Sequence, residues 1–221
     1  MPISMRKHIS RYEVILVDVD GTLYHRVPVR LAMAVELVFY ALTHIWRFGE
    51  LCALAYFRSL HNGATDTKDT AVHEQECYMR VIDRYAVSEA RLHDLVQRWL
   101  IKRPLKYLRL FRNRKLIATL TRLQTAGIFL VLYSDYPTTE KAAVLTGLQP
   151  DYQFCASDVG IECFKPCKKG VEYILKTVGV ATKDALMIGD QDKKDGASAR
   201  AVGMDYLIID KSRQARGILR I

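Results

Sequence analysis

The apolar positions of the chain change their spacing along its length. A short β-branched and apolar run at 13–17 predicts a buried strand. From 28 to 103 apolar residues recur at helical spacing, and no strand pattern interrupts them. We therefore expect about four helices in this segment, with breaks at Gly49 and at 61–63.

After Pro104 short apolar runs alternate with helical patterns. The predicted strands are 128–133, 152–156, 185–188 and 206–209, and the predicted helices are 113–125, 138–146, 168–178 and 197–202. Strands separated by helices in this way are typical of a parallel sheet that is covered on both faces. We therefore predict an α/β fold, a doubly wound parallel sheet, with the helical segment inserted after the first strand.

Polar residues gather where the predicted strands end. The four loops concerned carry Asp18-Val19-Asp20-Gly21-Thr22, Ser134-Asp135, Lys165-Pro166, and Gly189-Asp190 followed by Asp195. Each has an ordinary explanation by itself, since an Asp can stabilise a turn and a Ser can cap a helix. Ligands of open parallel sheets bind beyond the carboxyl ends of the strands, so together these loops indicate one site.

These segments resemble the four motifs of the haloacid dehalogenase (HAD)-like hydrolase superfamily, in the same order. They read DVDGTLY at 18–24, YSD at 133–135, FKP at 164–166 and GDQDKKDG at 189–196. The helical insertion lies between the first and second motifs, as in the subfamily with an α-helical C1-type cap. The resemblance implies a HAD-like Rossmannoid core at 1–27 and 104–221, and a cap at 28–103.

The junctions between these two parts contain prolines. Pro28 and Pro104 disfavour a continuous α-helix through the crossing points. We therefore expect hinges near 25–28 and near 103–104, where the cap would bend to admit substrate.

The resemblance also implies a role for each motif residue. Asp18 would be the nucleophile that forms an aspartyl-phosphate. Asp20 would protonate the leaving group and later deprotonate water. Ser134 would bind a phosphoryl oxygen, and Lys165 would offset the negative charge of Asp18 and of the phosphate.

A magnesium site is implied by the same motifs. Mg²⁺ prefers carboxylate, carbonyl and water oxygens in an octahedral arrangement. The expected ligands are Asp18, the main-chain carbonyl of Asp20, and Asp190, with Asp195 supporting the metal or its waters. Asp192, in the same loop, is expected to face solvent.

Contacts with the substrate are expected from residues of the motifs and from the start of the insertion. They are Ser134, Asp135, Lys165, Tyr24 and Arg26. The segment 25–26 is equally compatible with a solvated hinge, and the sequence leaves this open.

Asp20 bears on the type of reaction. A halide leaves without a proton, and the haloacid dehalogenases that this chain resembles lack an acid at this place. We therefore expect a phosphatase that acts on a small phosphate monoester. Phosphomutases share the four motifs and stay open, as does a phosphatase of lipid or prenyl phosphates. A protein that binds phosphate ligands without turnover is an alternative of another class, although no motif residue is missing.

The charge of the chain adds one feature. Lys and Arg number 33 against 24 Asp and Glu, which gives a net charge of +9 and suits anionic partners. The stretch 98–115 is rich in Lys and Arg and contains no acid, so it is either a solvated helical face or a functional surface. No motif for reading nucleic acid sequence is present.

The insertion is rich in aromatic residues, namely Phe39, Tyr40, Trp46, Phe48, Tyr56 and Phe57. Helical spacing favours the core of the cap for most of them. A greasy pocket or a membrane-facing surface is the alternative, so peripheral membrane contact stays open.

The remaining sequence features concern location. No apolar stretch reaches the ~20 residues of a membrane helix, and 1–11 is polar and basic rather than signal-like. The five cysteines are odd in number and form no CxxC pair, so we expect reduced thiols. We therefore expect a soluble cytoplasmic protein, a monomer or a homodimer.

Overall fold

A computed structural model describes residues 9–62, 69–145 and 147–209 of the chain. Its centre is a five-stranded parallel sheet in the order β3-β2-β1-β4-β5. The strands are β1 (Val14–Val17), β2 (Phe129–Ser134), β3 (Tyr152–Cys155), β4 (Ala185–Gly189) and β5 (Asp205–Ile208). The α/β fold with a parallel sheet that the sequence predicts is therefore confirmed.

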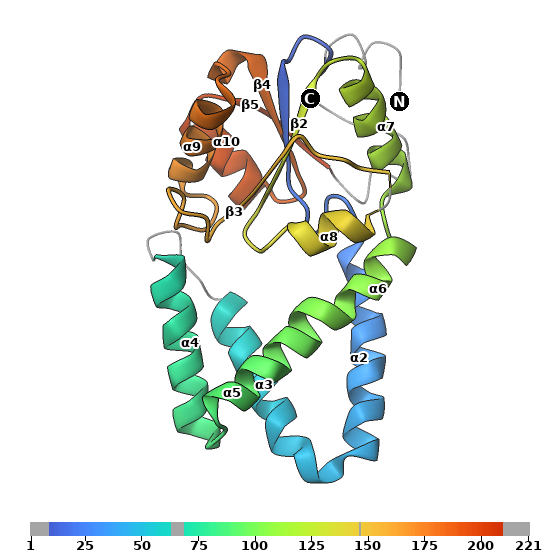
Figure 1. Cartoon of the computed structure of the whole chain (residues 1–221), viewed down its shortest axis with the longest axis vertical. Helices are drawn as coiled ribbons and strands as arrows, with labels where there is room; N and C mark the ends of the chain where they lie inside the picture. The colour runs from blue at the N-terminus through green and yellow to red at the C-terminus, as the bar shows by residue number, and fades with distance from the viewer. Residues whose placement is uncertain (1–8, 63–68, 146, 210–221) are drawn as a thin grey trace.

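Helices cover both faces of the sheet because alternate strand residues point to opposite sides. Val14 and Leu16 of β1 belong to one apolar cluster, which includes residues of α9 (Lys168–Val178) and α10 (Ala197–Ala201). Ile15 and Val17 belong to the other, which includes residues of α7 (Arg114–Thr125). Figure 1 shows α9 and α10 on one side of the sheet and α7 on the other. The short helix α8 (Thr139–Val144) follows β2.

A helical insertion connects β1 to β2. It consists of α2 (Arg26–Thr43), η1 (Ile45–Arg47), α3 (Phe48–Asn62), α4 (Thr70–Tyr85), α5 (Glu89–Val96), the π-helical turn η2 (Gln97–Lys102) and α6 (Arg103–Leu110). In Figure 1 these helices extend away from one end of the sheet. Helix α5 begins with a Ser88 cap, whose hydroxyl accepts a hydrogen bond from the backbone N–H of Arg91 at 3.3 Å.

Two expected breaks in this insertion are wrong. The chain turns at His44, and Gly49 lies within the first turn of α3. No break occurs at Pro104 either, because α5, η2 and α6 follow one another without a gap. The N–H of Arg103 bonds to the carbonyl of Arg98, five residues back. This wider π-helical turn spares Pro104 the clash with a carbonyl that an α-helix would impose.

The helix at the other junction begins earlier than expected. Helix α2 starts at Arg26, so Pro28 lies in its first turn, where proline is tolerated.

The aromatic residues of the insertion divide between core and surface. Tyr40 and Phe57 are buried and Tyr56 is half-buried, as expected of a packed core. Phe39, Trp46 and Phe48 are exposed instead. Helix α2 is apolar on more than one side, and only the side with Val29, Met33 and Tyr40 is buried.

Within the described residues, no single helix is long and apolar enough to cross a membrane. Helix α2 and the segment Ile45–His61 reach the required length and composition only together, and they are bent by 112° relative to each other. All five cysteines are free thiols.

Candidate active site

The strand order brings three of the predicted loops together. Strand β1 lies between β2 and β4, so the residues that follow these strands meet at one edge of the sheet. These residues are Asp18 after β1, Ser134 at the end of β2, and Asp190 after β4. The motif residues thus meet at a single site, which lies between the sheet and the helical insertion in Figure 1.

Asp18 is buried, and both of its carboxylate oxygens are engaged. The Lys165 ammonium lies 2.7 Å from Oδ1, and the Thr22 hydroxyl donates a hydrogen bond to Oδ2 at 3.0 Å. Burial raises the pKa of Asp18 to about 7; the charge of Lys165 opposes this shift, and the carboxylates of Asp195 and Asp20 add to it. The two contacts fix the orientation of the carboxylate.

Asp20 points to a different group of donors. Its carboxylate accepts hydrogen bonds from Ser134 Oγ at 3.0 Å, from Lys141 Nζ at 2.6 Å and from the hydroxyl of Tyr24. Burial by itself would raise the pKa of Asp20, but the charge of Lys141 and these hydrogen bonds outweigh burial and hold the pKa below its usual range. Asp20 is therefore a carboxylate at neutral pH in this arrangement.

Lys165 lies at the centre of the buried charges. Its ammonium is 2.7 Å from Asp18 Oδ1 and 2.7 Å from Asp195 Oδ1. Burial would lower the pKa of Lys165, but the charges of Asp18 and Asp195 hold it well above its ordinary value. Asp135 accepts a hydrogen bond from the backbone N–H of Lys165 at 2.9 Å, and Lys194 lies 2.6 Å from its other oxygen. Through its hydrogen bond with the backbone of Lys165, Asp135 holds that residue in position.

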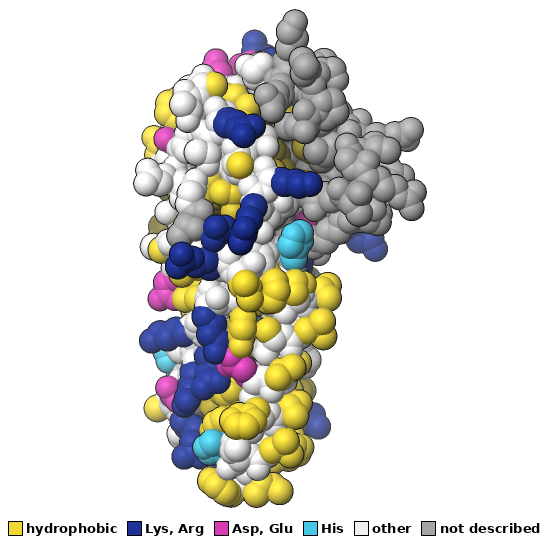
Figure 2. Space-filling view, turned by 90° about the vertical axis from the view of Figure 1, so that its right-hand side faces the viewer, with side chains coloured by type: hydrophobic (Ala, Val, Ile, Leu, Met, Phe, Trp, Pro, Cys, Tyr) yellow, Lys and Arg dark blue, Asp and Glu magenta, His cyan; other side chains and the backbone are white. Residues whose placement is uncertain are grey.

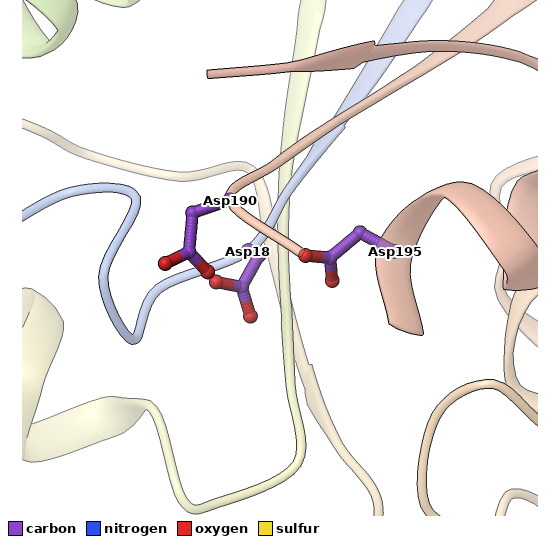
Figure 3. A group of neighbouring side chains, drawn as sticks. All are labelled: Asp18, Asp190 and Asp195. Atoms are coloured by element: carbon purple, nitrogen blue, oxygen red, sulfur yellow. The ribbon is translucent and has the colours of Figure 1, made fainter. Parts of the chain in front are cut away.

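Three carboxylates are suited to holding a metal ion. Figure 3 shows Asp18, Asp190 and Asp195 with their side chains converging. One oxygen of each lies within 4.8 Å of the others, and all three side chains are nearly inaccessible to solvent. Oxygen donors alone at this spacing fit a hard cation such as Mg²⁺. The carboxylate of Asp20 does not belong to this group.

Two glycines make the close approach of these loops possible. A Cβ at Gly189 would lie 2.3 Å from Cγ of Asp195, so a larger residue would displace that carboxylate. Gly21 has a φ of +94°, and a Cβ there would lie 2.4 Å from Oδ2 of Asp190. Glycine is required at both positions for the carboxylates to meet.

The family model for haloacid dehalogenase-like hydrolases matches residues 12–203. The chain belongs to the haloacid dehalogenase-like hydrolase family. No curated protein matches the sequence.

Solved structures share the fold of this HAD-like hydrolase at low sequence identity. A 2-haloacid dehalogenase from Pseudomonas syringae pv. tomato DC3000 has a TM-score of 0.58 and 15% identity, over 88% of this chain and 85% of that chain. A HAD phosphatase from Thermococcus onnurineus has a TM-score of 0.53 and 20% identity, over 90% of this chain and 86% of that chain. YfnB from Bacillus subtilis, assigned as a HAD-hydrolase and solved bound to magnesium, has a TM-score of 0.55 and 17% identity, over 89% of this chain and 87% of that chain. Dehalogenases and phosphatases both have this fold, so the fold alone does not select the reaction.

The two residues expected near the hinge of this HAD-like hydrolase are both at the site. Tyr24 donates its hydroxyl hydrogen bond to Asp20. Arg26 contacts both carboxylate oxygens of Asp190, at 2.6 and 2.5 Å. Asp192 is exposed and pairs with Arg200 at 2.7 Å, which places it away from the buried carboxylates.

Sequence reasoning missed three cations near the site. Lys141 comes from α8, Lys194 from the π-helical turn η4 (Asp192–Gly196) after β4, and Arg58 from α3 of the insertion. Although Arg58 reaches solvent, partial burial and the charge of Arg30 lower the pKa of its guanidinium, and the hydroxyls of Tyr136 and Tyr24 act in the opposite direction. Lys141 and Arg58 lie outside the four motifs, where a single Lys or Arg on a helix carries no signal that separates it from a surface residue. Lys194 lies within the segment GDQDKKDG, but the resemblance implies no role for it.

Proposed function

We propose that this HAD-like hydrolase is a magnesium-dependent phosphatase that acts on a phosphate monoester through an aspartyl-phosphate on Asp18. The observation that carries the proposal is Asp20, which lies two residues after Asp18 and accepts a hydrogen bond from Ser134 at the same site. A phosphate ester releases an alkoxide, which needs a proton, whereas a halide does not. A carboxyl group in this place therefore favours ester hydrolysis over dehalogenation.

The first step would form the acyl phosphate. A carboxylate oxygen of Asp18 attacks phosphorus, the bond from phosphorus to the ester oxygen breaks, and the departing oxygen takes a proton from Asp20. Lys165 and Thr22 hold the Asp18 carboxylate in one orientation, which lowers the entropic cost of attack. The Ser134 hydroxyl donates its hydrogen bond to Asp20 in this structure, so it lies on the side of the site where the phosphoryl oxygens and the leaving group would lie.

The second step would release phosphate. Asp20 removes a proton from water, the resulting oxygen attacks phosphorus, and the bond to Asp18 breaks to restore its carboxylate. The ionised state that Lys141 imposes on Asp20 suits this base role. The acid role in the first step requires a proton on Asp20, so esters with good leaving groups should depend on it least.

Asp18, Asp190 and Asp195 would hold Mg²⁺, with the main-chain carbonyl of Asp20. When bound, Mg²⁺ would act as a Lewis acid that offsets the negative charge of the phosphoryl oxygens beside the carboxylates. The Arg26 guanidinium forms an ion pair with Asp190 in this structure. It is therefore positioned to contact the substrate, or to release Asp190 when the metal cation binds. The bound magnesium of YfnB, which shares this fold, supports the assignment.

We propose further that residues 28–103 act as a cap over the site. Helix α3 carries Arg58, whose charge lies near Tyr24 and Tyr136 beside Asp20 and near the charge of Arg30 of α2. An arginine in this place suits an anionic group on the part of the substrate that leaves.

A screen of phosphate esters tests the proposal. The purified protein is given an aryl phosphate and then sugar, nucleotide, short-chain acid and prenyl phosphates, with Mg²⁺ and after exhaustive chelation, and released phosphate is measured. A parallel reaction with a 2-haloacid monitors halide release. We expect Mg²⁺-dependent phosphate release. Halide release without phosphate release, or full phosphatase activity after chelation, would contradict the proposal.

A further inference from the structure

Helix α2 and the turn after it expose a continuous apolar surface. We call it the apolar ridge and define it as Leu31, Val35, Val38, Phe39, Leu42 and Trp46. These residues are 59% to 76% exposed. The first five recur at spacings of three and four, so they share one side of α2, and Trp46 follows in η1. Figure 2 shows the ridge as a yellow band along the lower part of the molecule.

The fold itself does not account for the ridge. Helix α2 is anchored by Val29, Met33 and Tyr40, which are buried on its other side. A helix that packs along one side normally presents polar residues to water on the other. Exposed apolar surfaces of this extent on a folded protein mark sites of interaction.

A row of cations runs beside the ridge. An open groove of about 690 Å³ separates α2 from η2 and α6, and Val35 and Phe39 of the ridge lie on one wall. Arg47, Arg98 and Arg103 also line it, together with Lys106. The same groove contains one carboxylate, Glu36, which pairs with Arg103 at 2.8 Å and with Lys106. Figure 2 shows Lys and Arg side chains along the edge of the yellow band.

We propose that this face docks the protein on a lipid bilayer that contains anionic lipids. The ridge matches the hydrocarbon boundary of the bilayer, and the adjacent cations match its anionic headgroups. Trp46, at the turn between α2 and α3, is of the residue type enriched at membrane interfaces. The bend of 112° between α2 and Ile45–His61 presents this turn as an apolar corner that can enter the interface without crossing it.

A second copy of the chain fits this surface less well. A two-fold symmetric contact pairs a surface with itself, so two ridges in contact would bring both rows of cations close together. Like charges across an interface oppose association. The net charge of +9 works against self-association and in favour of an anionic surface.

Vesicle binding tests the proposal on the full chain. Co-sedimentation is measured with phosphatidylcholine vesicles that contain phosphatidylserine and with vesicles of phosphatidylcholine alone, at low and high salt. We expect stronger binding to the anionic vesicles and weakening by salt. No binding, or equal and salt-independent binding to both, would overturn the proposal.

Variants identify the surface. Leu42→Ser with Trp46→Ser should weaken vesicle binding about tenfold or more. Arg47→Gln with Arg98→Gln should weaken it about fivefold for each charge removed. The controls are Val72→Ser with Val159→Ser, exposed apolar residues outside the ridge, and Arg80→Gln with Lys183→Gln, exposed cations elsewhere. Equal losses in the controls would overturn the assignment to this face.

Two further measurements separate the alternatives. Sedimentation velocity reports the oligomeric state. The proposal would be overturned if the original protein is a dimer that does not bind vesicles and if the Leu42→Ser and Trp46→Ser variant is a monomer. That result would assign the ridge to contact with a second copy of the chain. Hydrolysis of a soluble aryl phosphate should be unchanged in the ridge variant. Docking does not rest on the proposed phosphatase activity, so either can fail without the other.

Discussion

Asp18 combines burial with two fixed contacts. Its pKa rises to about 7 through burial, while Lys165 at 2.7 Å favours the carboxylate form. The ammonium is in turn held by Asp195. Removing the charge of Lys165 would leave two buried carboxylates without compensation, which is costly, whereas removing either carboxylate leaves Lys165 paired with the other.

At the residue scale, Asp18→Asn should abolish phosphate release, with a loss of more than about a thousandfold, because a carboxamide cannot form the aspartyl-phosphate. The amide is nearly isosteric, so the fold should be kept, and circular dichroism with thermal melting checks this. Asp192→Asn is the matched control, since Asp192 is an exposed acid of the same motif. Turnover by Asp18→Asn at the original rate would refute the mechanism.

At the scale of elements, Glu36 ties α2 to α6. Its carboxylate accepts hydrogen bonds from Arg103 at 2.8 Å and from Tyr107, and it pairs with Lys106. Burial opposes ionisation, but the hydrogen bonds from these three residues hold the pKa of Glu36 below its usual range. The contact thus favours the ionised form in the folded protein.

A pH dependence of stability follows. A carboxyl whose pKa is lower in the folded state stabilises the protein at pH values above its unfolded-state pKa, which is about 4.3 for Glu. This stabilisation is lost as the pH falls through the pKa of the folded state. Glu36→Gln should therefore lower the free energy of unfolding by about 1 kcal/mol at pH 7 and by less in acid. Urea unfolding between neutral and acidic pH measures this. Glu13→Gln, at an exposed carboxylate, is the control.

Helix α3 contributes the second prediction at this scale. If Arg58 reads the leaving group, Arg58→Met should change the ranking of phosphate esters by about tenfold, since a lost contact to a charged group costs about 1.5 kcal/mol or more. Rates with an uncharged aryl leaving group should change little. Arg80→Met, at an exposed arginine of α4, is the control. A common fall in all rates, with the ranking preserved, would count against a specificity role.

At the scale of the whole molecule, metal binding should stabilise the fold. The carboxylates of Asp18, Asp190 and Asp195 repel one another, and a cation bound only by the folded state shifts unfolding by mass action. Mg²⁺ at about a hundred times its dissociation constant should add about 2.7 kcal/mol. The melting temperature should rise by roughly 5 °C or more and fall again on chelation.

Asp190→Asn should remove most of this stabilisation, whereas Asp192→Asn should keep it. Calorimetric titration with Mg²⁺ gives the affinity directly and is independent of turnover. An equal rise in melting temperature for both variants would mean that Mg²⁺ binds elsewhere.

The sequence by itself determined most of the helices and strands and the loops that meet at the candidate site. The predicted helix 168–178 coincides with α9, and the predicted strand 185–188 differs from β4 by one residue, because apolar periodicity is a local property of the chain. The convergence of Asp18, Ser134 and Asp190 was also predictable. Parallel strands direct their carboxyl ends to one edge, so residues that follow the strands meet there.

Only the tertiary structure decided which partners these residues have. The contacts of Lys141 with Asp20 and of Arg26 with Asp190 join positions 121 and 164 residues apart, and no local pattern encodes such pairs. The continuity of the helix through Pro104 depended on a π-helical turn, which periodicity does not reveal. Helix α2 is the clearest case, because it is apolar on both sides. Periodicity predicts that such a helix packs, but which side meets the protein and which stays exposed depends on how α2 lies against α6.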